Sequence, residues 1–134
     1  MEVIVEHLGD VQFEITARQH RVISDQPADN NGHDEGMTPP ELLLASLGSC
    51  AAYYAVDYFK RNKIAVEGVK ARVKAEKVKG PFRLDNFRIE VDVANELDEN
   101  QLKGLEDAVH RCLIHNTLLQ PPKIELTIHA VVAV

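Results

Sequence analysis

The sequence predicts a single α+β domain, with antiparallel sheets and a long buried central helix in the order βββ-α-ββ-α-β. Apolar and polar residues alternate with period two near the N-terminus, between residues 69 and 93, and from Lys123 to Val134. Two segments between these strands repeat their apolar residues at helical spacing. The chain has 134 residues, of which 45% are hydrophobic, and this is enough for one core. We therefore take residues 1–134 as one domain.

The first strands are expected before the loop at residue 25. Val3 and Val5 point to one face, and Gly9-Asp10 supplies a turn. Residues 11–16 then alternate as a second strand, and a third, shorter strand covers residues 21–24. Together they predict a small antiparallel sheet.

Residues 25–37 have no apolar periodicity and are rich in Pro, Gly, Asn and Asp. A loop of this length within a compact domain is frequently functional. Its His33-Asp34-Glu35 run could contact a metal ion, but a third, well-spaced ligand is missing. We interpret this run as a solvated acidic loop and expect no metal.

A long helix is expected from Thr38 to about Asn62. Thr38 is a suitable N-cap, Pro39 suits the first helical position, and Glu41 completes a capping box. Apolar residues cover nearly every side of this helix, which predicts burial all round. One small sheet cannot cover all sides of such a helix, so a second copy of the chain is the expected cover.

The second half predicts a hairpin, a helix and a last strand. Residues 69–76 and 87–93 alternate on either side of a turn at Gly80-Pro81. The second helix is capped by Asp98, and its apolar stripe carries Cys112 toward the core. The alternation from Lys123 to Val134 predicts a final strand.

Charge and composition exclude several classes of partner. The formal net charge is −6, whereas a nucleic-acid-binding domain needs a basic face. The N-terminus has no basic segment followed by a long apolar run, and no uninterrupted apolar stretch reaches about 20 residues. We expect a cytoplasmic protein with no nucleic-acid or membrane partner.

Cys50 and Cys112 are the only cysteines, and both fall within predicted helices. A disulfide-stapled domain would carry more cysteines in loops, and a zinc site would carry closely spaced ligands. Two thiols in helices therefore indicate either redox chemistry or buried cysteines that act as small hydrophobic residues.

Two sequence motifs carry a family resemblance. The first is GHDEGMTPPELLLASLGSCAAYY, with a cysteine deep in a long helix, and the second is HRCLIHNTL, with a cysteine 62 residues later. Together with the element order, they resemble the OsmC/Ohr superfamily of thiol-dependent peroxide-reducing proteins across nearly the whole chain. The resemblance implies an OsmC-like fold and an intertwined homodimer with two active sites at the subunit interface.

The resemblance also implies catalytic roles for both thiols. A peroxidatic thiolate attacks the O–O bond of an organic hydroperoxide and becomes a sulfenic acid, and a resolving thiol then forms a disulfide that an external dithiol reduces. Cys50 matches the first position and Cys112 the second. Their proximity is part of the resemblance, and no cofactor beyond the external dithiol is implied.

The chain departs from the family pattern at the residues that activate the thiol. The family's peroxidases carry an arginine on the first hairpin, but no arginine precedes Ala17 here, which leaves Arg18 and Arg21 as candidates or as solvated surface charges. The family glutamate ten residues before the cysteine is replaced by Pro40. Glu41 follows it, on the helix face opposite Cys50, because nine residues turn a helix through about 900°. Glu41 could serve only a partner's site, and its capping box explains it equally well.

Candidate pocket residues lie beside the cysteines. Tyr53, Tyr54 and Ser49 could line a cavity for a hydroperoxide or another small apolar molecule, although tyrosines on buried helices usually belong to the core. His110 and His115 flank Cys112 and lack a third group that would make a metal site.

Two functions follow from the sequence. The first is a two-cysteine, thiol-dependent peroxidase that reduces organic hydroperoxides in oxidative-stress defence. The alternative is a non-catalytic or redox-sensing protein that binds a small ligand and has lost the activating arginine and glutamate.

Overall fold

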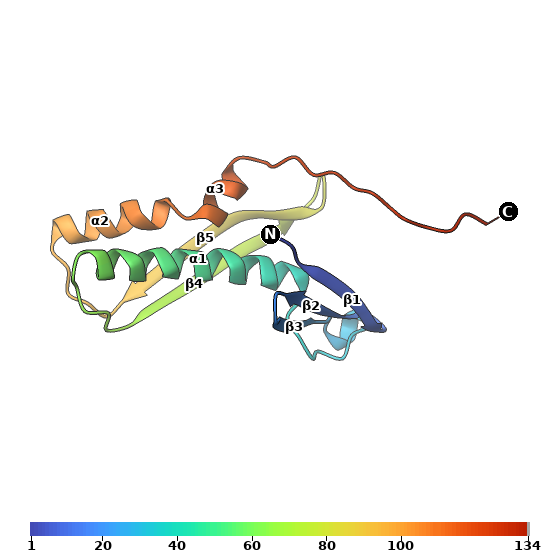
Figure 1. Cartoon of the computed structure of the whole chain (residues 1–134). Helices are drawn as coiled ribbons and strands as arrows, with labels where there is room; N and C mark the ends of the chain where they lie inside the picture. Colours follow the sequence, from blue (N-terminus) through green and yellow to red (C-terminus); the bar gives the residue numbers. More distant parts are fainter. Residues whose placement is uncertain (134) are drawn as a thin grey trace.

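The computed structural model describes residues 1–133 and contains two antiparallel sheets and a long helix (Figure 1). The first sheet has three strands in the order β1 (Ile4–Gly9), β2 (Gln12–Ala17) and β3 (His20–Ser24). The second is a hairpin of β4 (Val69–Val78) and β5 (Arg83–Val93). The helices are α1 (Pro39–Arg61), α2 (Glu99–His110) and α3 (Leu113–Leu119), with a short 3-10 turn, η1, at Ala28–Asn30. The predicted α+β fold class is confirmed.

The ends of α1 follow from its capping residues. Thr38 Oγ1 accepts from the backbone N–H of Glu41 at 3.4 Å, and Glu41 Oε1 accepts from the backbone N–H of Thr38 at 3.1 Å. At the other end, Asn62 Nδ2 donates to the carbonyl of Tyr58 at 2.8 Å. Both predicted ends of this helix are therefore confirmed.

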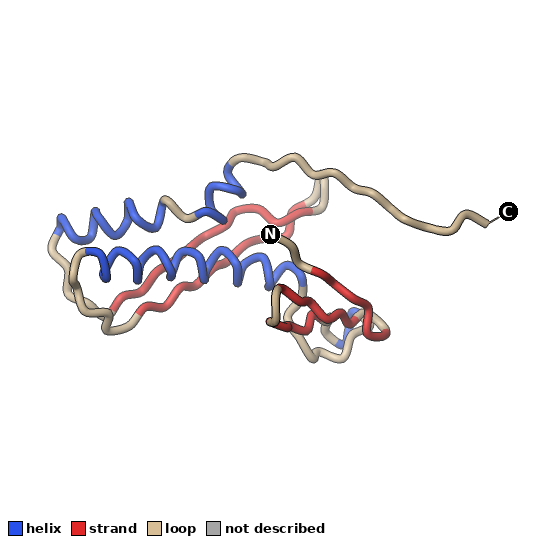
Figure 2. Tube along the Cα trace, in the orientation of Figure 1, coloured by secondary structure: helices blue, strands red, loops and turns tan. Residues whose placement is uncertain are grey.

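The main core lies between the C-terminal half of α1, the β4–β5 hairpin and α2. Ala55, Phe59 and Leu105 are its buried centre. Gly48 allows α1 to approach β4, because a Cβ there would lie 3.1 Å from Val73 Cγ2. As Figure 2 shows, α1 runs along the hairpin with α2 beside it.

The prediction that α1 is buried on every side is wrong for the single chain. Its buried residues share one face, and Tyr53 on another side is 61% exposed. The reason is that the hairpin and α2 cover one side of the helix and leave the others to solvent. By length and composition α1 is the one described helix that could cross a bilayer, and in the structure it packs on β4 and α2.

The predicted last strand is also wrong for the single chain, because residues 123–133 pair with no strand among the described residues. The segment leads away from the body (Figure 1). Ile124, Leu126 and Ile128 are 79–85% exposed. A strand forms only where a neighbouring strand takes up its backbone hydrogen bonds, and this chain offers none at that place. Val134 lies outside the described residues.

The loop before α1 is built around a buried carboxylate. Asp25 is 1% exposed and accepts from the backbone N–H groups of Gln26, His33 and Glu35 at 2.7, 3.3 and 3.2 Å. Gln12 Nε2 adds a hydrogen bond at 3.2 Å. Burial raises the pKa of Asp25, but these donors outweigh burial and leave the pKa below its usual value. The carboxylate thus fixes the loop against β2.

Replacing Asp25 by Asn is expected to destabilise the protein, because the new amide donor would face backbone donors in a buried site. The lowered pKa means that the carboxylate stabilises the fold above its unfolded pKa of about 3.9, and that this contribution disappears as the pH falls toward the folded pKa. Thermal unfolding between pH 3 and 7 should show a lower Tm and a weaker acid dependence for Asp25→Asn. Asp29→Asn, at an exposed residue of η1, is the control. Equal Tm profiles for both variants would contradict this account of the loop.

Candidate active site

Cys50 lies on the flank of α1 that faces α3. It is partly exposed, and the next residue, Ala51, is fully buried. Leu47 and Tyr54 stand about one turn before and after it.

Cys112 does not lie within a continuous helix, which corrects the sequence prediction. The chain leaves helical geometry at Cys112, where φ is −55° and ψ is 125°, and a new helix, α3, begins. Cys112 is the N-cap of α3, and its Sγ accepts from the backbone N–H of His115 at 3.5 Å. A side chain that accepts this hydrogen bond stabilises a break that the apolar spacing alone does not reveal. Cys112 is 0% exposed, as its predicted core position requires.

The structure brings the two thiols together. Burial raises the pKa of the Cys112 thiol, and hydrogen bonding and electrostatic repulsion from the neighbouring Cys50 raise it further. The N–H of His115 opposes the rise. Both cysteines are free thiols. The site therefore pairs a buried, protonated thiol with a second thiol that solvent can reach.

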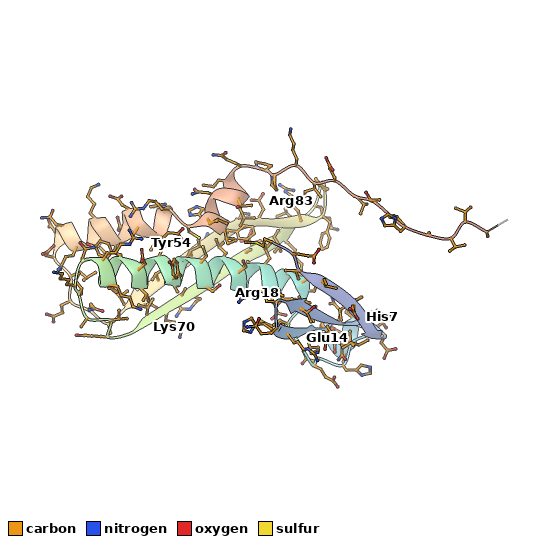
Figure 3. All side chains as sticks on the ribbon, in the orientation of Figure 1. His7, Glu14, Arg18, Tyr54, Lys70 and Arg83 are labelled. Atoms are coloured by element: carbon orange, nitrogen blue, oxygen red, sulfur yellow. The ribbon has the colours of Figure 1, made fainter. Side chains whose placement is uncertain are left out.

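The two arginine candidates and Glu41 lie elsewhere in the chain, and Arg21 and Glu41 are engaged by other side chains. Arg21 is exposed on β3 and pairs with Glu14 at 3.8 Å. Arg18 is exposed in the tight turn between β2 and β3, on the three-stranded sheet (Figure 3). Glu41 is held in its capping box, and hydrogen bonds from Thr38 lower its pKa. Within one chain, these contacts occupy Arg21 and Glu41 away from the cysteine pair.

The candidate pocket residues divide between two sides of α1. Tyr53 is exposed and packs edge-to-face on Tyr54, with ring centroids 5.2 Å apart. Ser49 Oγ donates to the carbonyl of Ser46 at 3.1 Å. Of the three, Tyr54 lines a hollow against α3, and Ser49 lines a separate hollow against β4.

The hollow lined by Tyr54 has a volume of about 720 Å³ and includes residues that the sequence prediction missed. Arg111 and Leu113, on either side of Cys112, line it together with polar residues of α3. From the sequence, only the position of Arg111 next to Cys112 could have indicated that Arg111 lines this hollow. The other wall of the hollow comes from Tyr54 of α1, which is distant in the sequence.

A second cavity, of about 610 Å³, lies on the other side of α3. Leu43 and Leu47 of α1, Phe87 and Ile89 of β5, and His115 line it. His115 and His110 have ring centroids 5.9 Å apart, and both border a third cavity over β5. The two cavities therefore flank α3, whose N-cap is Cys112.

The architecture defines a class of protein with a dithiol held between a long central helix and a helix junction. Residues 32–127 match the family model described as OsmC-like protein, so the chain belongs to the OsmC-like family. No curated protein matches the chain.

Solved structures share this fold. A protein from Psychrobacter arcticus 273-4, assigned to osmotic stress induction and detoxification response, is 26% identical with a TM-score of 0.78, over 86% of this chain and 85% of that one. An OsmC-like protein from Mycoplasma pneumoniae is 19% identical with a TM-score of 0.78, over 90% and 87%. An organic hydroperoxide resistance protein OsmC from Legionella pneumophila is 19% identical with a TM-score of 0.64, over 90% of each chain. The chain is a divergent member of the family.

Proposed function

We propose that the protein is a thiol-dependent peroxidase that reduces organic hydroperoxides, with Cys50 as the peroxidatic and Cys112 as the resolving thiol. The observation that carries the proposal is the pairing of a reachable Cys50 with a fully buried Cys112. Burial disfavours a negative charge on Cys112, which suits Cys112 to the resolving role and leaves the more accessible Cys50 as the thiol that meets the peroxide.

The proposed reaction has three steps. The Cys50 thiolate attacks the outer peroxide oxygen, the O–O bond breaks, and the leaving alkoxide takes a proton to give the alcohol. The Cys112 thiol then displaces hydroxide from the Cys50 sulfenic acid, which forms the disulfide and water. An external dithiol returns two electrons and two protons, and is released as its own disulfide.

The direction of the last step follows from accessibility. Cys112 is 0% exposed, so the external thiolate attacks the sulfur of Cys50. The Cys112 thiolate leaves, and the N–H of His115 already points at its sulfur, 3.5 Å away.

A mixed disulfide on Cys50 is therefore expected when the oxidised protein reacts with a monothiol. Diamide can form the Cys50–Cys112 disulfide without any peroxidase activity, and glutathione then supplies the attacking thiolate. Acid quenching and peptide mass spectrometry locate the adduct, and Cys112→Ser gives a reference for the Cys50 adduct. An adduct found mainly on Cys112 would contradict the direction of attack.

A redox-sensing or ligand-binding role is the second candidate. It is favoured by one observation, that Arg21 and Glu41 are engaged away from the thiols in the single chain. Steady-state turnover with cumene hydroperoxide and dithiothreitol, compared with hydrogen peroxide, separates the two functions. A peroxidase consumes many equivalents of the organic peroxide, whereas a sensor is oxidised once.

The active form that we propose is a soluble cytoplasmic homodimer. The chain exposes 10766 Å², whereas a compact monomer of 15.0 kDa exposes about 7000 Å². The excess includes uncovered sides of α1 and the apolar segment 123–133. A second copy that covers both would remove this surface from water and enclose the thiols.

A further inference from the structure

We propose that formation of the Cys50–Cys112 disulfide unwinds helix α3, because the sulfur of Cys112 is also the N-cap of that helix. With both thiols free, the cap is in place and α3 is folded. The inference rests on the proposed function only in taking the two cysteines as a redox pair, and it concerns what their disulfide does to the fold.

Helix α3 depends on its cap. The sulfur of Cys112 accepts from the backbone N–H of His115 at 3.5 Å, and the Cys112 carbonyl accepts from the N–H of Asn116 at 3.0 Å. Sulfur is a weak acceptor beside the oxygens of the usual caps, Ser, Thr, Asp and Asn. The first turn carries no acidic residue that would favour the helix N-terminus. A helix of seven residues with a weak cap has little stability of its own.

Tertiary packing adds little to α3. None of its residues is buried, and Leu113 and Leu119 are 60% and 68% exposed. The surroundings of Cys50 are different, because Leu47 and Ala51 beside it in α1 are 1% and 0% exposed. When the two sulfurs approach, α1 therefore keeps its place and the chain at the start of α3 moves.

The disulfide removes the cap. In the step that forms it, the Cys112 sulfur bonds to the sulfur of Cys50, the S–O bond of the sulfenic acid breaks, and the thiol proton leaves with the oxygen as water. The two thiols are hydrogen-bonded neighbours, whereas bonded sulfurs lie only about 2.05 Å apart. Because the cap is already long at 3.5 Å, a small displacement of the Cys112 sulfur is enough to break it.

Unwinding of α3 changes the path of the chain that follows. Seven residues span about 10 Å as a helix and about 23 Å when extended. The segment 123–133 follows α3 after Pro121-Pro122, so the disulfide lengthens the tether of this segment. Helix α3 also forms a wall of the two cavities that flank it. The redox state of the two cysteines is thus converted into a change of chain position.

Hydrogen exchange tests this coupling without peroxidase turnover. Diamide takes two electrons and two protons from the thiols of the full-length protein, and intact mass confirms the disulfide as the loss of two hydrogen atoms. Residues 115–120 should then exchange their amide hydrogens about three- to thirtyfold faster than in the reduced protein, as expected for the loss of an N-cap. Helix α2, which is capped by Asp98, should exchange at an unchanged rate.

Three variants separate the cap from the disulfide. Cys112→Ala removes the acceptor without oxidation, so its α3 should exchange as fast in reducing buffer as α3 of the oxidised wild type. Cys112→Ser supplies a hydroxyl oxygen, which is a stronger cap, and its α3 should stay protected before and after diamide. Cys50→Ser keeps the capping sulfur and cannot form the disulfide, so its α3 should not respond to diamide.

Equal exchange of α3 in the reduced and disulfide forms would overturn the proposal. Protection of α3 in Cys112→Ala, or a response to diamide in Cys50→Ser, would overturn it as well, and so would the absence of a Cys50–Cys112 disulfide after diamide. An α3 that responds to the disulfide in a protein without hydroperoxide turnover would retain the coupling and reject the peroxidase. Turnover with an unresponsive α3 would do the reverse.

Discussion

Cys50→Ser is expected to abolish the reduction of organic hydroperoxides, with a loss in kcat/KM of about a thousandfold or more. A serine hydroxyl does not ionise at neutral pH and is a poor nucleophile toward a peroxide oxygen, and removal of a catalytic nucleophile commonly has effects of this size. Cys112→Ser should behave differently. Its Cys50 can react once, releasing one equivalent of alcohol, and then remains a sulfenic acid.

The two variants are distinguished by measurements on the protein itself. Dimedone labelling and intact mass should detect the sulfenic acid in Cys112→Ser, and excess peroxide should convert it to sulfinic acid. The intact mass of the wild-type protein should instead decrease by the mass of two hydrogen atoms as the disulfide forms. Asp29→Asn, at an exposed residue of η1, is the control. Residual turnover in Cys50→Ser would transfer the peroxidatic role to Cys112 and contradict the proposed order.

Features with local causes could be predicted from the sequence. The capping box at Thr38 and Glu41 involves residues three apart, and it fixes the start of α1 where expected. Alternation predicted the β4–β5 hairpin in the same way, although β5 begins at Arg83, earlier than the clear alternation at Phe87. Backbone pairing with β4 extends this strand beyond its apolar pattern.

Features that depend on distant contacts could not be predicted. The apolar spacing continues through Leu113, and neither Gly nor Pro stands at Cys112. The sequence therefore contains no signal for the helix break at that residue. The meeting of the two thiols was implied by family resemblance alone, and the structure places them together. Arg111 was missed because its relevance comes from Tyr54, on another helix. The roles of Cys50, Cys112, Tyr53, Tyr54 and Ser49 stay predictions.

Ile128→Asp is expected to convert a dimer of about twice 15.0 kDa into a monomer or an aggregate. Residues 123–133 alternate apolar and polar side chains but cover nothing in their own chain, and Ile128 is 79% exposed. We propose that this segment pairs with an open sheet edge of the second copy and buries its apolar face there. An aspartate on that face would be desolvated without a partner, which is strongly unfavourable.

Thr127→Asp provides the matched control, because successive side chains of a strand point to opposite faces. It introduces the same charge one residue away, on the face expected to remain in water. Multi-angle light scattering at micromolar concentration measures the mass of each protein, and circular dichroism reports whether the helices persist. If both variants and wild type have the mass of one chain, the segment has no dimer partner. If both aspartate variants remain dimers, the interface lies elsewhere on the exposed sides of α1.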